Sequence, residues 1–157
     1  MAPQKQRVLK LTNFRYKKEG VSDKEFHEAT SKQHAPKAAI VQARHGVLKV
    51  SHYYTPSATK NIITEKFPWS VRPGWEIDDH DVTVSLYVPN IETLQAIVTD
   101  PDFQALVMNE DGICDPDRGR MTMGWEEVHV EDGQIVSFDY GSFEELTGAS
   151  VDGETST

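Results

Sequence analysis

The sequence has few of the features that a secreted or nucleic-acid-binding protein needs. Its 157 residues include one cysteine, Cys114, which excludes a disulfide framework within the chain and a cysteine-based zinc site. Lys and Arg number 16 against 25 Asp and Glu, and the formal net charge of -9 offers no basic surface to nucleic acid or an anionic membrane. The chain also lacks an apolar run long enough for a membrane span or a signal peptide. We therefore expect a cytoplasmic protein whose partners are neither nucleic acids nor membranes.

Motifs for nucleophilic catalysis and for cofactor binding are missing too. The chain has no G-x-S-x-G segment, no glycine-rich phosphate loop and no dinucleotide fingerprint. Residues 109–120 contain several acidic side chains but do not match the spacing of an EF-hand loop. If the protein is an enzyme, we expect an acid–base site that works without a cofactor.

Strand and helix patterns alternate along the chain. Hydrophobic residues make up 38%, which is enough for one folded domain. Ser22, followed by Glu25 three residues later, forms a capping-box pattern that predicts the start of a helix. We expect a strand at 7–18, a helix at 23–44 interrupted near Pro36, a strand at 47–55, a loop at 56–79, a strand at 80–88, a helix at 91–108 broken at Pro101, and a strand at 120–130 that turns at 131–133 into 134–138.

Strand, broken helix and strand, twice over, predict an α+β fold of the ferredoxin-like split βαβ type. With both helices on one face of the sheet, the other face is uncovered. We expect that face to be apolar and to bind a second copy, giving a homodimer of the dimeric α+β barrel type. The proline breaks are expected to leave a cleft between helices and sheet. Residues 1–6 are then an N-terminal extension, 7–136 the folded domain, and 137–157 a mobile acidic tail rich in Gly, Ser and Thr.

Two histidines and a tyrosine are candidates for chemistry in this cleft. His34 lies beside the expected break at Pro36, and it either caps freed carbonyl groups or points into the cleft as a general acid. His52 and Tyr54 share one face of their strand by alternation. Such groups on a core face satisfy a local partner or, beside a cleft, take part in catalysis, and both interpretations stay open.

A third histidine, His80, opens the next strand at the mouth of the same face. It lies in the acidic run at residues 78–81, so it is either part of a solvated turn or a catalytic group oriented by Asp79 or Asp81. The four residues are consecutive, and their side chains therefore cannot all converge on one ion. We expect no metal site here.

The predicted loop at 56–79 carries two tryptophans, Trp69 and Trp75, between prolines. Exposed tryptophans are unusual unless they pack on something. They form either a small satellite core or a lid that stacks on a flat aromatic ligand. Arg72, between the tryptophans, and Arg15 and Arg44, elsewhere in the chain, offer positive charge for a carboxylate.

Three segments carry a family likeness: FRYKKEGVSDKEFHEATSKQHAP, HDVTVSLYVPNIETLQAIVTDPDF and MGWEEVHVEDGQIV. Together they resemble the EthD-domain proteins of filamentous fungi, a branch of the dimeric α+β barrel superfamily. The likeness spans residues 7–136, and the family's F…H-A-P stretch matches Phe26 and His34 to Pro36. It implies a cofactor-free enzyme that tailors aromatic polyketides, because members are described as decarboxylases or dehydratases. More distant relatives are polyketide cyclases and anthrone monooxygenases, so the resemblance supports the fold better than the reaction.

We therefore predict a cofactor-free lyase that decarboxylates an aromatic polyketide carboxylic acid, similar to atrochrysone carboxylic acid, by His and Tyr acid–base catalysis. The alternatives are a dehydratase, a cyclase or cofactor-free monooxygenase on the same scaffold, and a non-catalytic ligand carrier or accessory protein. Product mass separates the reactions, whereas a pocket without any pKa-perturbed histidine favours the carrier. The predicted catalytic residues are His34, His52, His80 and Tyr54, and the predicted substrate-binding residues are Tyr16, Phe26, Trp69, Arg72, Trp75 and Asp81.

Overall fold

A four-stranded antiparallel sheet forms the centre of the molecule, with the strand order β2-β3-β1-β4. The computed structural model describes residues 7–148, so the predicted extension at 1–6 and positions 149–157 of the predicted tail lie outside the described residues. The elements in chain order are β1 (Leu9–Lys17), α1 (Asp23–His27), the π-helix η1 (Glu28–His34), α2 (Ala35–Arg44), β2 (Lys49–Tyr54), α3 (Ser57–Lys66), the 3-10 helix η2 (Pro68–Ser70), β3 (Val82–Val88), α4 (Ile91–Val98), α5 (Pro101–Met108), the 3-10 helix η3 (Asn109–Gly112), β4 (Cys114–Gly124), β5 (Val130–Glu131), β6 (Gln134–Ile135) and α6 (Phe143–Thr147).

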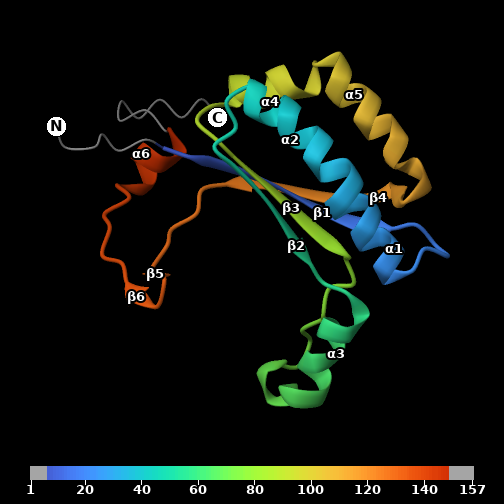
Figure 1. Cartoon of the computed structure of the whole chain (residues 1–157). Helices are drawn as coiled ribbons and strands as arrows, with labels where there is room; N and C mark the ends of the chain where they lie inside the picture. Colours follow the sequence, from blue (N-terminus) through green and yellow to red (C-terminus); the bar gives the residue numbers. More distant parts are fainter. Residues whose placement is uncertain (1–6, 149–157) are drawn as a thin grey trace, which may run out of the picture.

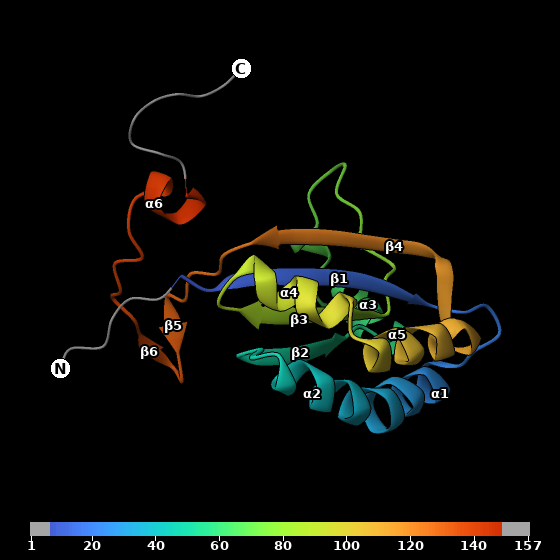
Figure 2. The same cartoon turned by 90° about the horizontal axis from the view of Figure 1, so that it is seen from above.

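The helices α1, α2, α4 and α5 lie together on one face of this sheet (Figure 1, Figure 2). The main core joins them to the strands: Leu86 and Val88 of β3 pack with Leu94 and Ile97 of α4. The strand order, together with the position of these four helices on a single face of the sheet, is that of the ferredoxin-like α+β fold. The predicted fold class is therefore confirmed.

The first helical segment continues through Pro36 without the predicted interruption. Ser22 and Glu25 form the predicted capping box at its start. From Glu28 to His34 the backbone is π-helical, and the Ala35 N–H donates to the Thr30 carbonyl, five residues back. A wider turn of this kind accommodates a proline, because Pro36 has no N–H to donate and its ring needs space beside the preceding turn. The proline in the sequence therefore predicts an irregular helix at this position, but it does not predict that the irregularity is a π-helical segment.

The second helical segment is broken where the sequence predicts a break. Helix α4 ends at Val98, and Asp100 caps α5 by accepting a hydrogen bond from the Asp102 N–H at 2.9 Å. Pro101 occupies the start of α5, where a missing N–H costs nothing. The chain changes direction here, so that α4 and α5 cover different parts of the sheet (Figure 2).

The open face of the sheet is not the apolar surface that we expected. Alternation along the strands places Thr12 of β1 and Ser85 of β3 on this face, and their hydroxyl groups lie 3.2 Å apart. Tyr53 of β2 also points outward and is 66% exposed. The hydrophobic reason given for a dimer is therefore wrong, although the homodimer itself stays a prediction.

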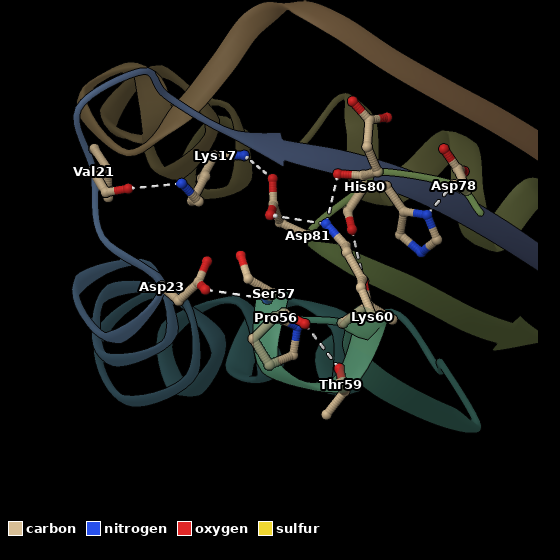
Figure 3. A network of polar contacts seen from close by, with 12 residues as sticks. Lys17, Val21, Asp23, Pro56, Ser57, Thr59, Lys60, Asp78, His80 and Asp81 are labelled. Atoms are coloured by element: carbon tan, nitrogen blue, oxygen red, sulfur yellow. Dashed lines mark hydrogen bonds and ion pairs between the residues drawn. The ribbon is translucent and has the colours of Figure 1, made fainter. Parts of the chain in front are cut away.

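The predicted loop at 56–79 contains a helix, α3, which extends from the end of the sheet away from the other helices (Figure 1). A polar network fastens this segment to β1 and β3 (Figure 3). The Lys60 ammonium donates to the Asp79 carbonyl at 2.8 Å and lies 3.6 Å from the Asp81 carboxylate. Asp81 in turn accepts a hydrogen bond from the Lys17 N–H at 2.8 Å.

The last predicted strand, at 120–130, is wrong in both of its limits. Strand β4 starts earlier and ends at Gly124, whereas residues 130–131 belong to a separate two-stranded hairpin with β6. The predicted turn of this hairpin is confirmed: Asp132 and Gly133 have φ angles of 51° and 75°. This pair of positive angles is typical of the tight turns that favour Asp-Gly.

Part of the predicted tail is structured. Ser142 caps α6 through its side chain, which accepts a hydrogen bond from the Glu145 N–H. The Tyr140 hydroxyl accepts a hydrogen bond from the Val128 N–H at 2.7 Å and so ties the segment to the chain beyond β4. Within residues 7–148, no helix combines the length and the apolar character needed to cross a bilayer.

Candidate active site

A cavity of about 590 Å³ lies between the helices and the sheet. Its floor is apolar along β3, in the middle of the sheet, whereas each of the two neighbouring strands contributes one apolar and two polar side chains. Helical residues, among them His34 from η1, form the opposite wall. The floor residues include Val82 and Val84 of β3, His52 and Tyr54 of β2, and Asn13 and Arg15 of β1.

One chain of hydrogen bonds fixes His52 and Tyr54. Nδ1 of His52 lies 3.2 Å from the Tyr54 hydroxyl, which lies 2.9 Å from the Thr30 hydroxyl. Thr30 donates its single proton to the Phe26 carbonyl at 2.8 Å. Tyr54 must then donate to Thr30 and accept from Nδ1 of His52. This assignment leaves Nε2 of His52 with a free lone pair, available to a ligand in the cavity.

Burial keeps His52 in this neutral form. Desolvation, and secondly the positive charge of His34, lower the pKa of His52 below its ordinary value of 6.5, against a smaller opposing influence of Glu110. A neutral imidazole with Nδ1 protonated is an acceptor at Nε2. The cavity therefore contains a base that stays unprotonated near neutral pH.

His34 belongs to a second polar group, formed from three separate elements. Its Nε2 lies 2.8 Å from Oε1 of Glu110 on η3. The Arg15 guanidinium of β1 lies 3.0 Å from the other carboxylate oxygen, Oε2. At one end of the cavity, one carboxylate oxygen of Glu110 therefore faces the His34 imidazole and the other faces the Arg15 guanidinium.

Glu110 is ionised in this setting. Burial alone raises the pKa of Glu110, but the hydrogen bond from His34 and the charges of Arg15 and His34 outweigh that effect and lower it. Oε2 is buried and makes no well-aligned hydrogen bond, although Arg15 is within ion-pair distance. We take this contact as an ion pair held by charge, because the distance is short while the alignment is poor. Since an ionised carboxylate only accepts, His34 donates to it from Nε2.

His80 does not line the cavity. Its ring lies edge-on to Phe14, 4.9 Å between centroids, and Phe14 points to the open face because Asn13 and Arg15 on either side of it line the cavity. Nδ1 of His80 lies 2.8 Å from Asp78 and Nε2 lies 2.8 Å from the Thr83 hydroxyl. The predicted position of His80 on the cavity face is therefore wrong. Strand β3 begins only at Val82, so strand alternation does not extend back to His80.

The predicted orienting partners of His80, Asp79 and Asp81, make other contacts. The carboxylate that His80 contacts is Asp78 (Figure 3). Burial opposes ionisation of Asp78, but the hydrogen bond and charge of His80 lower the pKa of Asp78 overall. Asp81 binds the Lys17 N–H, as described above, and so fastens the loop rather than the histidine.

The structure places the other predicted binding residues outside the cavity. Phe26 is 2% exposed and belongs to a small core with Val82 and Cys114. Tyr16 is buried beneath the Arg118 guanidinium, 3.9 Å from its ring centroid. On the segment that contains α3, the side chains of Trp69 and Trp75 are 79% and 62% exposed, and the Arg72 guanidinium lies 5.4 Å from the centre of the Trp75 ring. The tryptophans form neither a buried satellite core nor, in this arrangement, a cover over the cavity.

Five polar residues of the cavity wall were not identified from the sequence, among them Asn13, Thr30 and Glu110. Asn13 had no signal beyond its inward position on a strand. Thr30 lies four residues after Phe26, a spacing at which a threonine hydroxyl reaches the helix carbonyl, and that signal was available. Glu110 lay in a segment that was interpreted as a loop leading into the last strand, and its partner His34 is far away in the sequence.

The chain belongs to the EthD family, because the family model described as EthD domain matches residues 18–117. A protein of Aspergillus terreus, named provisionally as an oxygenase, is 33% identical over 84% of this chain and 82% of its own length. Dehydratase iacD of Pestalotiopsis fici is 24% identical over 84% of this chain and 95% of its own. Decarboxylase claH of Passalora fulva is 28% identical over 83% of each.

These relatives confirm the predicted resemblance and the prediction of an enzyme, with a lyase as the reaction class that the dehydratase and decarboxylase names share. Among solved structures, an EthD-family protein of Bacillus halodurans aligns with a TM-score of 0.48 at 14% identity, over 76% of this chain and 99% of that one. A likeness of this size says nothing about the reaction.

Proposed function

We propose that the protein is a cofactor-free lyase that decarboxylates an aromatic polyketide carboxylic acid. The observation that carries the proposal is the position of Arg15. It is the sole Lys or Arg among the described residues that line the cavity, in a protein whose net charge is -9. A guanidinium at one end of a largely apolar cavity favours a flat ligand with one carboxylate. The decarboxylase names among the relatives agree with such a substrate.

Arg15 is able to bind a second carboxylate. Its ion pair with Glu110 uses one terminal nitrogen, Nη2, and a guanidinium has five N–H donors in all. The remaining donors have no partner among the residues that the structure describes, so they are available to a substrate carboxylate near β1, while the apolar residues Val82 and Val84 support the ring system. The cavity volume suits an aromatic ligand of several fused rings.

The residues around this position supply the groups that decarboxylation of a β-keto acid needs. The bond between the ring system and the carboxylate breaks, carbon dioxide leaves, and the electron pair becomes an enolate. His34, oriented by Glu110, donates a hydrogen bond to the developing enolate oxygen when its ring is protonated, and then supplies a proton to complete the product. His52 accepts a hydrogen bond from a substrate hydroxyl at Nε2. No step requires a cofactor.

Dehydration is the second candidate, and the lowered pKa of His52, which keeps its imidazole neutral, favours it. Loss of water next to a carbonyl needs a base to remove a carbon-bound proton and an acid to protonate the leaving hydroxyl. His52, with its lowered pKa, is suited to the first role and His34 to the second. Two of the relatives are named as dehydratases.

The two reactions differ in product mass. Purified protein is incubated without added metal or cofactor with an atrochrysone-type carboxylic acid, and the product is identified by mass spectrometry. Loss of carbon dioxide supports the proposal, and loss of water supports the second candidate. A gain of oxygen, an unchanged mass with a new cyclisation pattern, or saturable binding without any product contradicts both.

We also propose that the protein is a homodimer and acts in the cytoplasm. The segment after β4 extends from the body of the domain (Figure 1) and exposes large apolar side chains, among them Ile135 at 87% and Phe143 at 67%. Such side chains are typical of surfaces that bind another chain. Light scattering at micromolar concentration is expected to give twice the monomer mass of 17.7 kDa, and a clean monomer contradicts the proposal.

A further inference from the structure

Two buried side-chain atoms lack a hydrogen-bond partner among the described residues, and both belong to the same cavity. They are Oδ1 of Asn13 and Oε2 of Glu110. Oε2 of Glu110 still has the Arg15 guanidinium at ion-pair distance, whereas Oδ1 of Asn13 has neither a hydrogen bond nor an ion pair with any described residue. Buried polar atoms in native proteins are almost always paired, so an unpaired one at a cavity wall points to a ligand.

The strand register places Asn13 on the cavity floor. On β1 it pairs with Val84 of β3 on one side and with Met121 of β4 on the other. The same register pairs Val84 with His52 of β2. His52, Val84, Asn13 and Met121 therefore form one row across the sheet, with their side chains on the cavity face.

This row sets the distance between its polar members. His52 and Asn13 are two strands apart, about 10 Å between backbones, with the apolar Val84 between them. The neighbouring row has the same arrangement, with Tyr54 and Arg15 on either side of Val82. Along β1, Asn13 and Arg15 are two residues apart, about 7 Å. A flat ligand lying over β3 thus meets a polar group at each edge, and meets two along β1.

From this geometry we infer that Asn13 is a substrate-positioning residue, which accepts a hydrogen bond from a ring hydroxyl while Arg15 holds the carboxylate of the same molecule. The inference rests on the proposed function and extends it: the ligand is an aromatic acid that carries a hydroxyl group away from its carboxylate. Asn13 selects the orientation of the ring system, because the ligand rotated end for end brings its carboxylate to the uncharged amide. If the edge of the ligand that faces Asn13 carries no hydroxyl group, the buried Oδ1 stays unpaired, and the ligand binds with a less favourable free energy.

The test compares two small aromatic acids that differ by one hydroxyl group, 2-naphthoic acid and 6-hydroxy-2-naphthoic acid. Their dissociation constants for the full-length protein are measured by titration calorimetry. We expect the hydroxylated acid to bind about three- to tenfold tighter, as one net hydrogen bond provides. In Asn13→Leu this preference is expected to vanish, while the affinity for 2-naphthoic acid stays the same or increases. Asn13→Asp keeps an oxygen acceptor and is expected to keep the preference, although its charge weakens the binding of both acids.

Further variants keep the test decisive. Arg15→Met is expected to weaken the binding of both acids by the same factor, because both carry the carboxylate. Asn13→Leu is expected to be at least as thermally stable as the wild type, because an apolar group replaces an unpaired oxygen. If the leucine side chain does not fit, Asn13→Ala takes its place. The inference is overturned if the variant that lacks the Asn13 amide still prefers the hydroxylated acid by the wild-type factor. It is also overturned if the wild type binds neither acid at millimolar concentration.

These outcomes are separate from the failure of the proposed function. A hydroxyl preference that depends on Asn13, in a protein that releases no carbon dioxide from any polyketide acid, supports the inference and contradicts decarboxylation. Conversely, normal decarboxylation with a hydroxyl preference that survives Asn13→Leu contradicts the inference alone.

Discussion

Two histidine–carboxylate pairs of equal length lie on opposite faces of the sheet. His34 contacts Glu110 at 2.8 Å in the cavity, and His80 contacts Asp78 at 2.8 Å on the open face. Nδ1 and Nε2 of His80 both have protein partners, so its ring has no nitrogen left for a ligand. His34 contacts Glu110 through Nε2 and lines the cavity. The distance within a pair therefore says little about its role, which depends on the second nitrogen and on the space beside it.

The largest expected difference is between substitutions of the two histidines. We expect His34→Gln to lower kcat about a hundredfold or more, because a general acid contributes about 10²- to 10⁴-fold. His80→Gln is expected to leave kcat within about threefold but to lower the free energy of unfolding by about 1–3 kcal/mol, because a buried paired network is disrupted. Steady-state kinetics on a confirmed substrate and thermal unfolding of both variants measure these effects.

The reverse pattern, in which His80→Gln abolishes turnover in a fully folded protein and His34→Gln does not, contradicts the assignment of roles to the two faces. Equal losses of activity in both variants, with equal losses of stability, would show that unfolding alone accounts for the effect.

Removing the charge of Glu110 sharpens the comparison further. Glu110→Gln keeps the shape of the side chain but replaces a charge-assisted hydrogen bond with a neutral one, which is weaker by about 1 kcal/mol. We expect kcat to fall about five- to tenfold, because the hydrogen bond that orients His34 is weaker, and the acidic limb of the pH profile to move to lower pH, because the charge of Glu110 raises the pKa of His52. Asp78→Asn is the matched control on the open face, and there we expect an unchanged pH profile. A pH profile that Glu110→Gln leaves unchanged argues for a purely structural carboxylate.

The pH dependence of the wild type reports on His52. Burial, together with the charge of His34, lowers its pKa below 6.5, so the neutral form persists as the pH falls from 7. We expect the acidic limb of the kcat/KM profile to lie below 6.5 and to move or disappear in His52→Gln. The stability contribution has the same sign: it is fully present above about 6.5, and it is lost as the pH falls from there through the lower folded-state pKa. An acidic limb above 6.5 contradicts the assignment.

The smallest effects are expected in the segment that contains α3. Trp69 and Trp75 are mostly exposed, so replacing either with Ala is expected to change the free energy of unfolding by no more than about 0.5 kcal/mol. The predicted lid closure remains testable by fluorescence in a Trp125→Phe background, which removes the signal of the third tryptophan in the chain. Saturable quenching by a product analogue, lost in Trp69→Ala or Trp75→Ala, supports a lid. A signal that does not respond to ligand, in a protein that turns over normally, excludes it.

The elements of the fold were largely predictable because each depends on local patterns. The capping box at Ser22, the Asp-Gly turn at 132–133 and the break at Pro101 are decided within a few residues. Pro36 shows the limit of such patterns: a proline predicts a disturbance of the helix, but the choice between a break and a π-helical turn depends on what the helix packs against.

The site was predictable in part. Strand alternation alone placed His52 and Tyr54 on one face, and the tertiary structure brought that face to the cavity. His80 was misplaced because it precedes the strand whose alternation was applied to it. Its acidic neighbours in the sequence suggested Asp79 or Asp81 as the orienting carboxylate, but the carboxylate that contacts His80 is Asp78, on the other side of the sheet.

The sequence by itself determined the order of the four sheet strands and of the helices between them, the acidic charge and the family, because these depend on local periodicity, composition and short motifs. Only the tertiary structure decided which charged groups meet. Glu110, Arg15 and His34 come from three elements that are distant in the sequence, and no local pattern contains the distance between them. Their contact depends on the packing of η1 and η3 over one end of β1, and the ionised state of Glu110 follows from that contact.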